Sequence, residues 1–228
     1  MLSEIFKLFW KTVERKDKRR INSQTSPTEI EQFCDIQYID DGLWQHRLDV
    51  YSKSGKLSHR PVIIDIHGGG WMYGTKEINK NYCLALAQRD YVVVNINYRL
   101  APDFSVADQL RDCFFAFKWV STNIEKYGGD LNNVFVTGDS AGGFLAAYSA
   151  LLNSSEKLRK IFGVTESGLE FRACGLTSPV CFMNTHTFQD VYYSRVKGKE
   201  FSESTLRGFE NFDAVLDKGS MPPTFLVT

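Results

Sequence analysis

The sequence predicts an α/β fold, a mostly parallel, doubly wound sheet with a functional site at the carboxyl ends of its strands. Three observations predict it. Short apolar runs typical of buried strands alternate with helical stretches. A run of glycines follows one of these strands, and a serine framed by glycines follows another. Because the carboxyl ends of parallel strands meet at one edge of a sheet, we expect the two motifs to lie together.

The expected elements follow one another in the order that such a sheet requires. Residues 36–39 and 48–51 predict two short antiparallel strands joined through Asp41 and Gly42. In residues 106–124, apolar side chains recur at three- and four-residue spacing, which indicates a helix packed on the core. The remaining strands are expected at 62–66, 91–96, 133–136, within 171–182 and at 221–228, and the remaining helices at 82–89 and 141–152.

The serine motif lies at a predicted strand–turn–helix junction. Residues 136–143 (VTGDSAGG) place Ser140 between Gly138 and Gly142. Such a turn exposes the serine at a helix N-terminus, where free N–H groups and the helix dipole favour developing negative charge. A plain helix cap is the alternative interpretation, but a cap needs no glycine on both flanks. The pattern therefore favours a serine nucleophile.

The glycine motif gives a second candidate feature. Residues 67–71 (HGGGW) directly follow the apolar run 62–66. Consecutive glycines leave backbone N–H groups uncovered, and such groups can hold the oxygen of a tetrahedral intermediate together with the N–H after the nucleophile. A flexible turn would explain the glycines alone, but not their joint occurrence with the serine motif.

With these motifs, the chain resembles α/β hydrolases of the hormone-sensitive-lipase-like group, close to bacterial carboxylesterases and acetyl esterases and to BD-FAE-like enzymes. The segments 97–102 (NYRLAP) and 127–130 (YGGD) also fit, and the resemblance runs from about Tyr38 onward. It implies an α/β-hydrolase fold and hydrolysis of small or short-acyl esters through an acyl-enzyme intermediate. A formamidase or other amidase, a noncatalytic ligand-binding protein and a fragment without function remain as alternatives.

The resemblance also implies a role for each motif residue. Ser140 is the expected nucleophile, and the N–H groups of Gly69, Gly70 and Ala141 are the expected oxyanion donors. His67 is expected to orient the glycine loop and not to act as the base. The supporting residues are His67, Gly68, Gly138, Asp139 and Gly142, and the candidate pocket residues are Trp71, Met72 and Tyr73.

In this group the residues of the catalytic triad follow one another in the order serine, acid, histidine. The sequence does not complete this order. We expect the strand at 221–228 to be the next-to-last of the fold, which leaves the last strand and helix, the acid and the histidine outside this chain. The truncated form should then be nearly inactive and prone to aggregate, with an open sheet edge. His46 and His59 are expected to be exposed, and His186, the only histidine after Ser140, is the alternative candidate for the base.

The domain organisation follows from the motifs. We expect an N-terminal cap segment over residues 1–35 and an incomplete catalytic domain over 36–228, with a cap insert at 183–218. Residues 2–10 are apolar and are followed by basic residues between 15 and 20, the reverse of a signal peptide. A cap helix is the favoured interpretation, and a helix on a membrane surface is the alternative.

Composition excludes several other classes. Lysine plus arginine equals aspartate plus glutamate at 27 each, which argues against a nucleic-acid partner. The five cysteines form no C-x-x-C pair; Cys113 and Cys174 are expected in the core, and a reducing, cytoplasmic location is favoured. No metal-ligand spacing, cofactor motif or transmembrane segment is found, and a homo-oligomer stays an open option.

Overall fold

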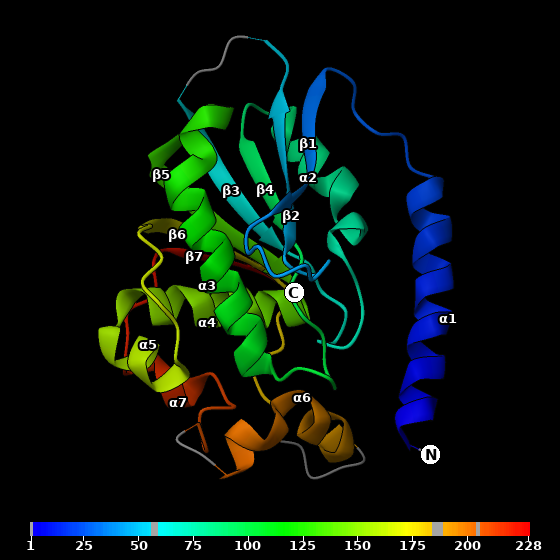
Figure 1. The fold of residues 1–228 in the computed structure, drawn as a ribbon, viewed down its shortest axis with the longest axis vertical. Helices are drawn as coiled ribbons and strands as arrows, with labels where there is room; N and C mark the ends of the chain where they lie inside the picture. Colours follow the sequence, from blue (N-terminus) through cyan, green and yellow to red (C-terminus); the bar gives the residue numbers. More distant parts are fainter. Residues whose placement is uncertain (1, 56–58, 184–188, 204–205) are drawn as a thin grey trace.

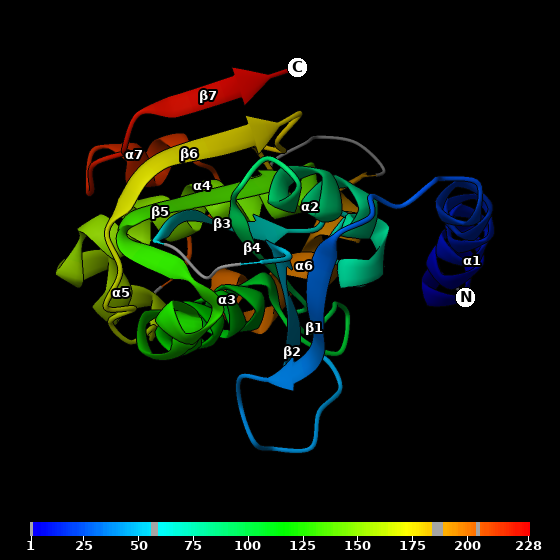
Figure 2. The same ribbon diagram turned by 90° about the horizontal axis from the view of Figure 1, so that it is seen from above.

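A twisted sheet of seven strands runs through the described part of the molecule, in the order β1-β2-β4-β3-β5-β6-β7 (Figures 1 and 2). The computed structural model describes residues 2–55, 59–183, 189–203 and 206–228. The strands are β1 (Ile30–Gln37), β2 (Arg47–Lys53), β3 (Arg60–Ile66), β4 (Val92–Ile96), β5 (Gly129–Asp139), β6 (Phe171–Thr177) and β7 (Thr224–Val227).

The sheet is mostly parallel, as predicted. From β4 to β7, neighbouring strands pair in parallel, whereas β1 and β2 form an antiparallel pair and β2 runs antiparallel to β4. The predicted antiparallel pair of the N-terminal half is thus confirmed, with β1 beginning at Ile30. Residue 35, the expected end of the cap segment, lies inside β1.

Helices cover both faces of the sheet, which confirms the doubly wound arrangement. In β4, Val92, Val94 and Ile96 face the large core beneath α3 and α4, and Val93 faces a small core beneath α2. Burial on both faces explains why β3 and β4 read as nearly continuous apolar runs. The helices are α1 (Leu2–Asn22), α2 (Lys80–Ala87), α3 (Val106–Asn123), α4 (Ala141–Ser154), α5 (Glu156–Phe162), α6 (Gln189–Glu203) and α7 (Asp213–Leu216).

Two helices, α1 and α6, and the edge strand β7 lie at the periphery of the molecule. Helix α1 lies apart from the sheet at the side of the molecule, and α6 lies across the end toward which β3 and β5 run (Figure 1). At the other edge, β7 pairs only with β6 among the described strands, and Phe225 and Leu226 on it are 73% and 56% exposed. A strand predicted within 221–228 is therefore found at this edge, but it covers only Thr224–Val227.

Candidate active site

Ser140 occupies the turn between β5 and α4. Its φ of +51° lies in the left-handed region that few residues other than glycine adopt. Its backbone N–H donates to the carbonyl oxygen of Thr177 at 2.9 Å, and its own carbonyl accepts from Val180 at 3.2 Å. Hydrogen bonds to the last residue of β6 and to the segment after it thus hold the strained backbone in place, at a partly exposed position.

Two glycines allow α4 to lie very close to the strands β3 and β5. A Cβ atom on Gly142 would meet the carbonyl oxygens of Ile66 and His67, and one on Gly138 would meet the backbone of Gly142. The first turn of α4 therefore lies directly against the end of β3, where Ile66 pairs with Gly138. This contact brings the serine turn and the glycine loop together, as the sequence predicts.

The glycine loop leaves backbone donors available beside the serine turn. Gly69 and Gly70 both have positive φ, and the carbonyl of Gly69 accepts from Met72 and Tyr73, which folds the loop back on itself. Within the described residues, the N–H groups of Gly69, Gly70 and Ala141 donate no hydrogen bond. Three unpaired N–H groups can stabilise an anion.

His67 lies fully buried beneath this loop. Its ring stacks on Tyr98 with centroids 4.4 Å apart, and its Nδ1 lies 2.7 Å from the carbonyl oxygen of Gly68. Burial lowers the pKa of His67 to about 4, against the opposing effects of Gly68 and Asp139. A neutral imidazole wedged under the glycines fits a role in shaping the loop better than one in proton transfer.

A partly buried network of hydrogen bonds, which sequence reasoning missed, connects the two motifs. Asp139 Oδ1 accepts from the Gly68 N–H at 3.0 Å and from Asn79 Nδ2 at 2.9 Å. The same Asn79 nitrogen donates to Asp65 Oδ2 at 2.9 Å. The motif carboxylate thus acts on the loop and not on the serine. Asn79 carries no sequence signal, because a single asparagine before a helix is common at any cap.

Asp65 provides a pH-dependent test of this network. Burial raises its pKa to about 7; the charge of Asp139 adds to the effect, and the hydrogen bond from Asn79 opposes it. Between about pH 4 and pH 7 the folded state therefore holds a proton that the unfolded state has lost. The free energy of unfolding should fall by about 2–3 kcal/mol from about pH 5 to about pH 8 through this group alone.

We expect Asp65→Asn to remove this slope, because the amide is neutral at every pH and its oxygen can still accept from Asn79. Urea unfolding at both pH values checks it, with the exposed Asp103→Asn as the matched control. An Asp65→Asn variant with the wild-type slope would contradict the assignment.

The other histidines do not meet Ser140. His46 was expected to be exposed, but this is wrong: it is 2% exposed, with Nδ1 2.7 Å from Asp41 Oδ2 and Nε2 3.2 Å from Asp112 Oδ1. The carboxylate of Asp112 on α3 attracts it into the interior. His59 is exposed, and His186 lies outside the described residues. Within the described part, no histidine is hydrogen-bonded to the Ser140 hydroxyl.

Helices α1 and α6 both reach the glycine loop. The hydroxyl of Tyr192 on α6 donates to the carbonyl oxygen of Gly70, and a Cβ atom on Gly70 would touch the ring of Trp10 on α1. A pocket of about 300 Å³ lies here. It is lined by Phe6, Phe9, Trp10, Gly70, Trp71, Val180, Tyr192 and Tyr193.

A second pocket, of about 230 Å³, is also lined by Trp10 and has a mostly apolar lining that includes Met72 and Tyr73. Trp10 stacks on Tyr73 with centroids 5.4 Å apart, and its side chain lines both pockets. Trp71 is 2% exposed and packs edge-on against Phe144, which gives it a core role as well. In the described ranges, no group of three histidine, cysteine or acidic side chains could hold a metal ion.

The strand order, the helices on both faces and the sharp turn at Ser140 define an α/β hydrolase. The model of the BD-FAE family matches residues 48–188, and the chain belongs to this family. Esterase B from Lactobacillus rhamnosis, crystallised with a C4-C4 tributyrin phosphonate inhibitor, superposes with a TM-score of 0.92 at 31% identity. That match covers 99% of this chain and 73% of the esterase.

Two relatives of known function are esterases as well. The isoprenylcysteine α-carbonyl methylesterase ICME of Arabidopsis thaliana is 29% identical over 192 residues, 80% of this chain and 45% of the relative. The carboxylesterase NlhH of Mycobacterium tuberculosis is 35% identical over 113 residues, 49% of this chain and 35% of the relative. The chain thus spans less than half the length of either relative.

Proposed function

We propose that the protein is a carboxylesterase-type serine hydrolase of small or short-acyl esters, with Ser140 as the nucleophile. The observation that carries this proposal is the strained turn of Ser140 beside three unpaired N–H groups. The esterase relatives support the reaction class, and the tributyrin-derived inhibitor of esterase B is consistent with short acyl chains.

The proposed reaction is a two-step acyl transfer. The Ser140 hydroxyl attacks the ester carbonyl, and the oxygen that becomes negative is held by the N–H groups of Gly69, Gly70 and Ala141. The alcohol leaves, and water then releases the acyl group from the serine. Trp71, Met72 and Tyr73 are proposed to line the substrate pockets. The N-terminal segment 1–35 and the insert 183–218 are proposed to cap them, which the positions of Trp10 and Tyr192 support.

The proposed mechanism needs a base, and the described histidines do not provide one. His67 is buried with a lowered pKa, and both nitrogens of His46 face carboxylates. Without a base, the hydroxyl of Ser140 is a weak nucleophile, and only an acceleration of roughly 10³–10⁴ over water remains. We therefore propose that this chain alone hydrolyses esters slowly.

Free imidazole tests the role of Ser140 by supplying a base from solution. We expect imidazole to raise the rate of p-nitrophenyl butyrate hydrolysis through Ser140 by at least about tenfold. This is a part of the roughly 10²–10⁴-fold rate increase that a positioned base contributes. The Ser140→Ala variant, measured at each imidazole concentration, subtracts the catalysis by imidazole itself. Equal rates for the two proteins, with and without imidazole, would show that Ser140 is not the nucleophile.

A further inference from the structure

Helix α1 has one face bound to the rest of the molecule and one face turned to solvent. Phe6, Trp10 and Asp17 recur at spacings of four and seven residues and so share a face. Phe6 packs edge-on against Tyr192, Trp10 stacks on Tyr73, and Asp17 accepts from the Tyr73 hydroxyl at 3.2 Å. This inner face fixes the orientation of the helix relative to the candidate active site.

The opposite face combines apolar and basic side chains. Leu8, Arg15 and Arg19 recur at spacings of seven and four residues, half a turn around the helix from the inner face. All three are exposed, Leu8 by 67%, and the neighbouring Phe9 is 56% exposed. Large apolar side chains exposed next to a run of basic ones are typical of a surface that meets a partner.

The charge of α1 stands out from that of the chain. The whole sequence is balanced at 27 basic and 27 acidic residues, whereas the 21 residues of α1 contain seven basic and three acidic ones. The exposed basic residues include Lys11, Arg15, Lys16, Lys18 and Arg19. The rest of the chain therefore has a net negative charge, and the excess of basic residues lies in α1.

We propose that α1 is a docking surface for an anionic lipid bilayer. The helix would lie in the plane of the interface, with Leu8 and Phe9 in the headgroup–acyl boundary and the basic residues among the lipid phosphates. None of the described helices has the length and apolar character needed to cross a bilayer, which agrees with a helix lying flat on one. The inference does not depend on the proposed esterase activity.

The lipid surface explains both halves of the pattern. A second copy that met this face with its own α1 would present the same basic side chains and repel them, and a purely anionic polymer would leave Leu8 and Phe9 unused. Contact of α1 with a bilayer would place the pocket at Gly70 one helix diameter, about 10–12 Å, from the interface.

Vesicle flotation tests the proposal, because aggregated protein does not float. The protein is mixed with vesicles of phosphatidylcholine, or of phosphatidylcholine with an equal amount of phosphatidylglycerol. We expect flotation with the anionic vesicles only. The double variant Arg15→Gln/Arg19→Gln should bind about 25-fold more weakly, about fivefold for each basic residue near the surface. Leu8→Ser should also weaken binding.

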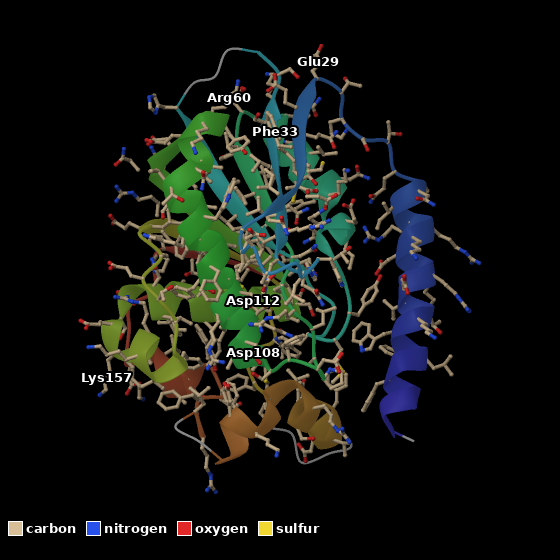
Figure 3. The ribbon with its side chains drawn as sticks, viewed as in Figure 1. Glu29, Phe33, Arg60, Asp108, Asp112 and Lys157 are labelled. Carbon is tan, nitrogen blue, oxygen red and sulfur yellow. The ribbon has the colours of Figure 1, made fainter. Side chains whose placement is uncertain are left out.

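The matched control is Lys118→Gln/Lys157→Gln, which removes two exposed charges elsewhere; Lys157 lies on the far side of the molecule from α1 (Figure 3). Because all these side chains are exposed, thermal unfolding should be unchanged in every variant. No flotation with anionic vesicles, or equal loss in the control and the Arg15→Gln/Arg19→Gln variant, would overturn the proposal. A concentration-dependent dimer abolished by Leu8→Ser in size-exclusion chromatography would assign the face to a second copy instead.

Discussion

Replacement of Gly142 by alanine should lower the free energy of unfolding by more than about 4 kcal/mol, a loss that few single substitutions cause. The added Cβ would overlap the carbonyl oxygen of Ile66 and lie 2.5 Å from that of His67. Both oxygens are backbone atoms at the end of a central strand, so no side-chain rotation can relieve the clash. Either α4 moves away from β3 or the strand bends, and each change opens the core.

Gly143→Ala is the matched control for this experiment. Gly143 is equally buried in the same helical turn, but a Cβ there would lie 3.0 Å from Pro179 Cβ and 3.2 Å from the carbonyl oxygen of Gly138. Alanine gains about 1 kcal/mol of helix propensity over glycine at both positions, so that Gly143→Ala should change stability by less than about 1 kcal/mol. Urea midpoints measure both variants, and equal midpoints would refute the close contact between strand and helix.

The same contact explains how far the sequence alone could lead. Glycines on both flanks of Ser140 predict that a helix and a strand meet without side chains between them, and Gly142 does lie against β3. The apolar runs that alternate with helices predict a parallel sheet. The strands of such a sheet are buried on both faces and therefore show no alternation of polar and apolar residues. Local patterns of this kind are sufficient where one residue type is the only one that fits.

Contacts between distant segments were not predictable in this way. Asn79 joins Asp65 to Asp139 across 14 and 60 residues of sequence, and His46 finds Asp112 in the interior although its neighbours are polar. Trp10 and Tyr192 come from opposite ends of the chain to the same glycine. No local sequence pattern predicts such contacts, because they depend on how whole helices and strands pack against one another.

A cluster of charged side chains around Asp112 leads to the second prediction of a large effect on stability. Asp112 on α3 is completely buried and accepts three hydrogen bonds from the side chain of Arg99, one from Nη2 to Oδ1 at 2.6 Å and two from Nε, to Oδ1 at 3.0 Å and to Oδ2 at 2.9 Å. Figure 3 shows Asp108 and Asp112 on the same helix, facing the middle of the molecule. The pair also anchors the loop after β4, in which the Ala101 N–H donates to the Trp71 carbonyl at 2.8 Å.

Arg99→Met should therefore cost about 3–5 kcal/mol at about pH 8, because it keeps the aliphatic stem but leaves a buried carboxylate without its cation. Arg172→Met is the matched control, since Arg172 pairs with Glu170 on the surface, at side-chain exposures of 47% and 77%. Such exposed pairs contribute about 0–1 kcal/mol. Urea unfolding of both variants gives the comparison, and similar losses would contradict a special role for the buried pair.

The pH dependence of this loss separates charge from packing. Burial alone would lower the pKa of His46, but the carboxylates of Asp112 and Asp41 beside its two nitrogens outweigh this effect, and the pKa is raised. The stability from protonated His46 is thus complete below about pH 6.5 and is lost as the pH rises through the raised pKa. Without Arg99, the imidazolium is the remaining cation beside Asp112, so the cost of Arg99→Met should shrink at about pH 5. A cost that is equal at both pH values would mean that Arg99 stabilises the loop by packing and not by balancing Asp112.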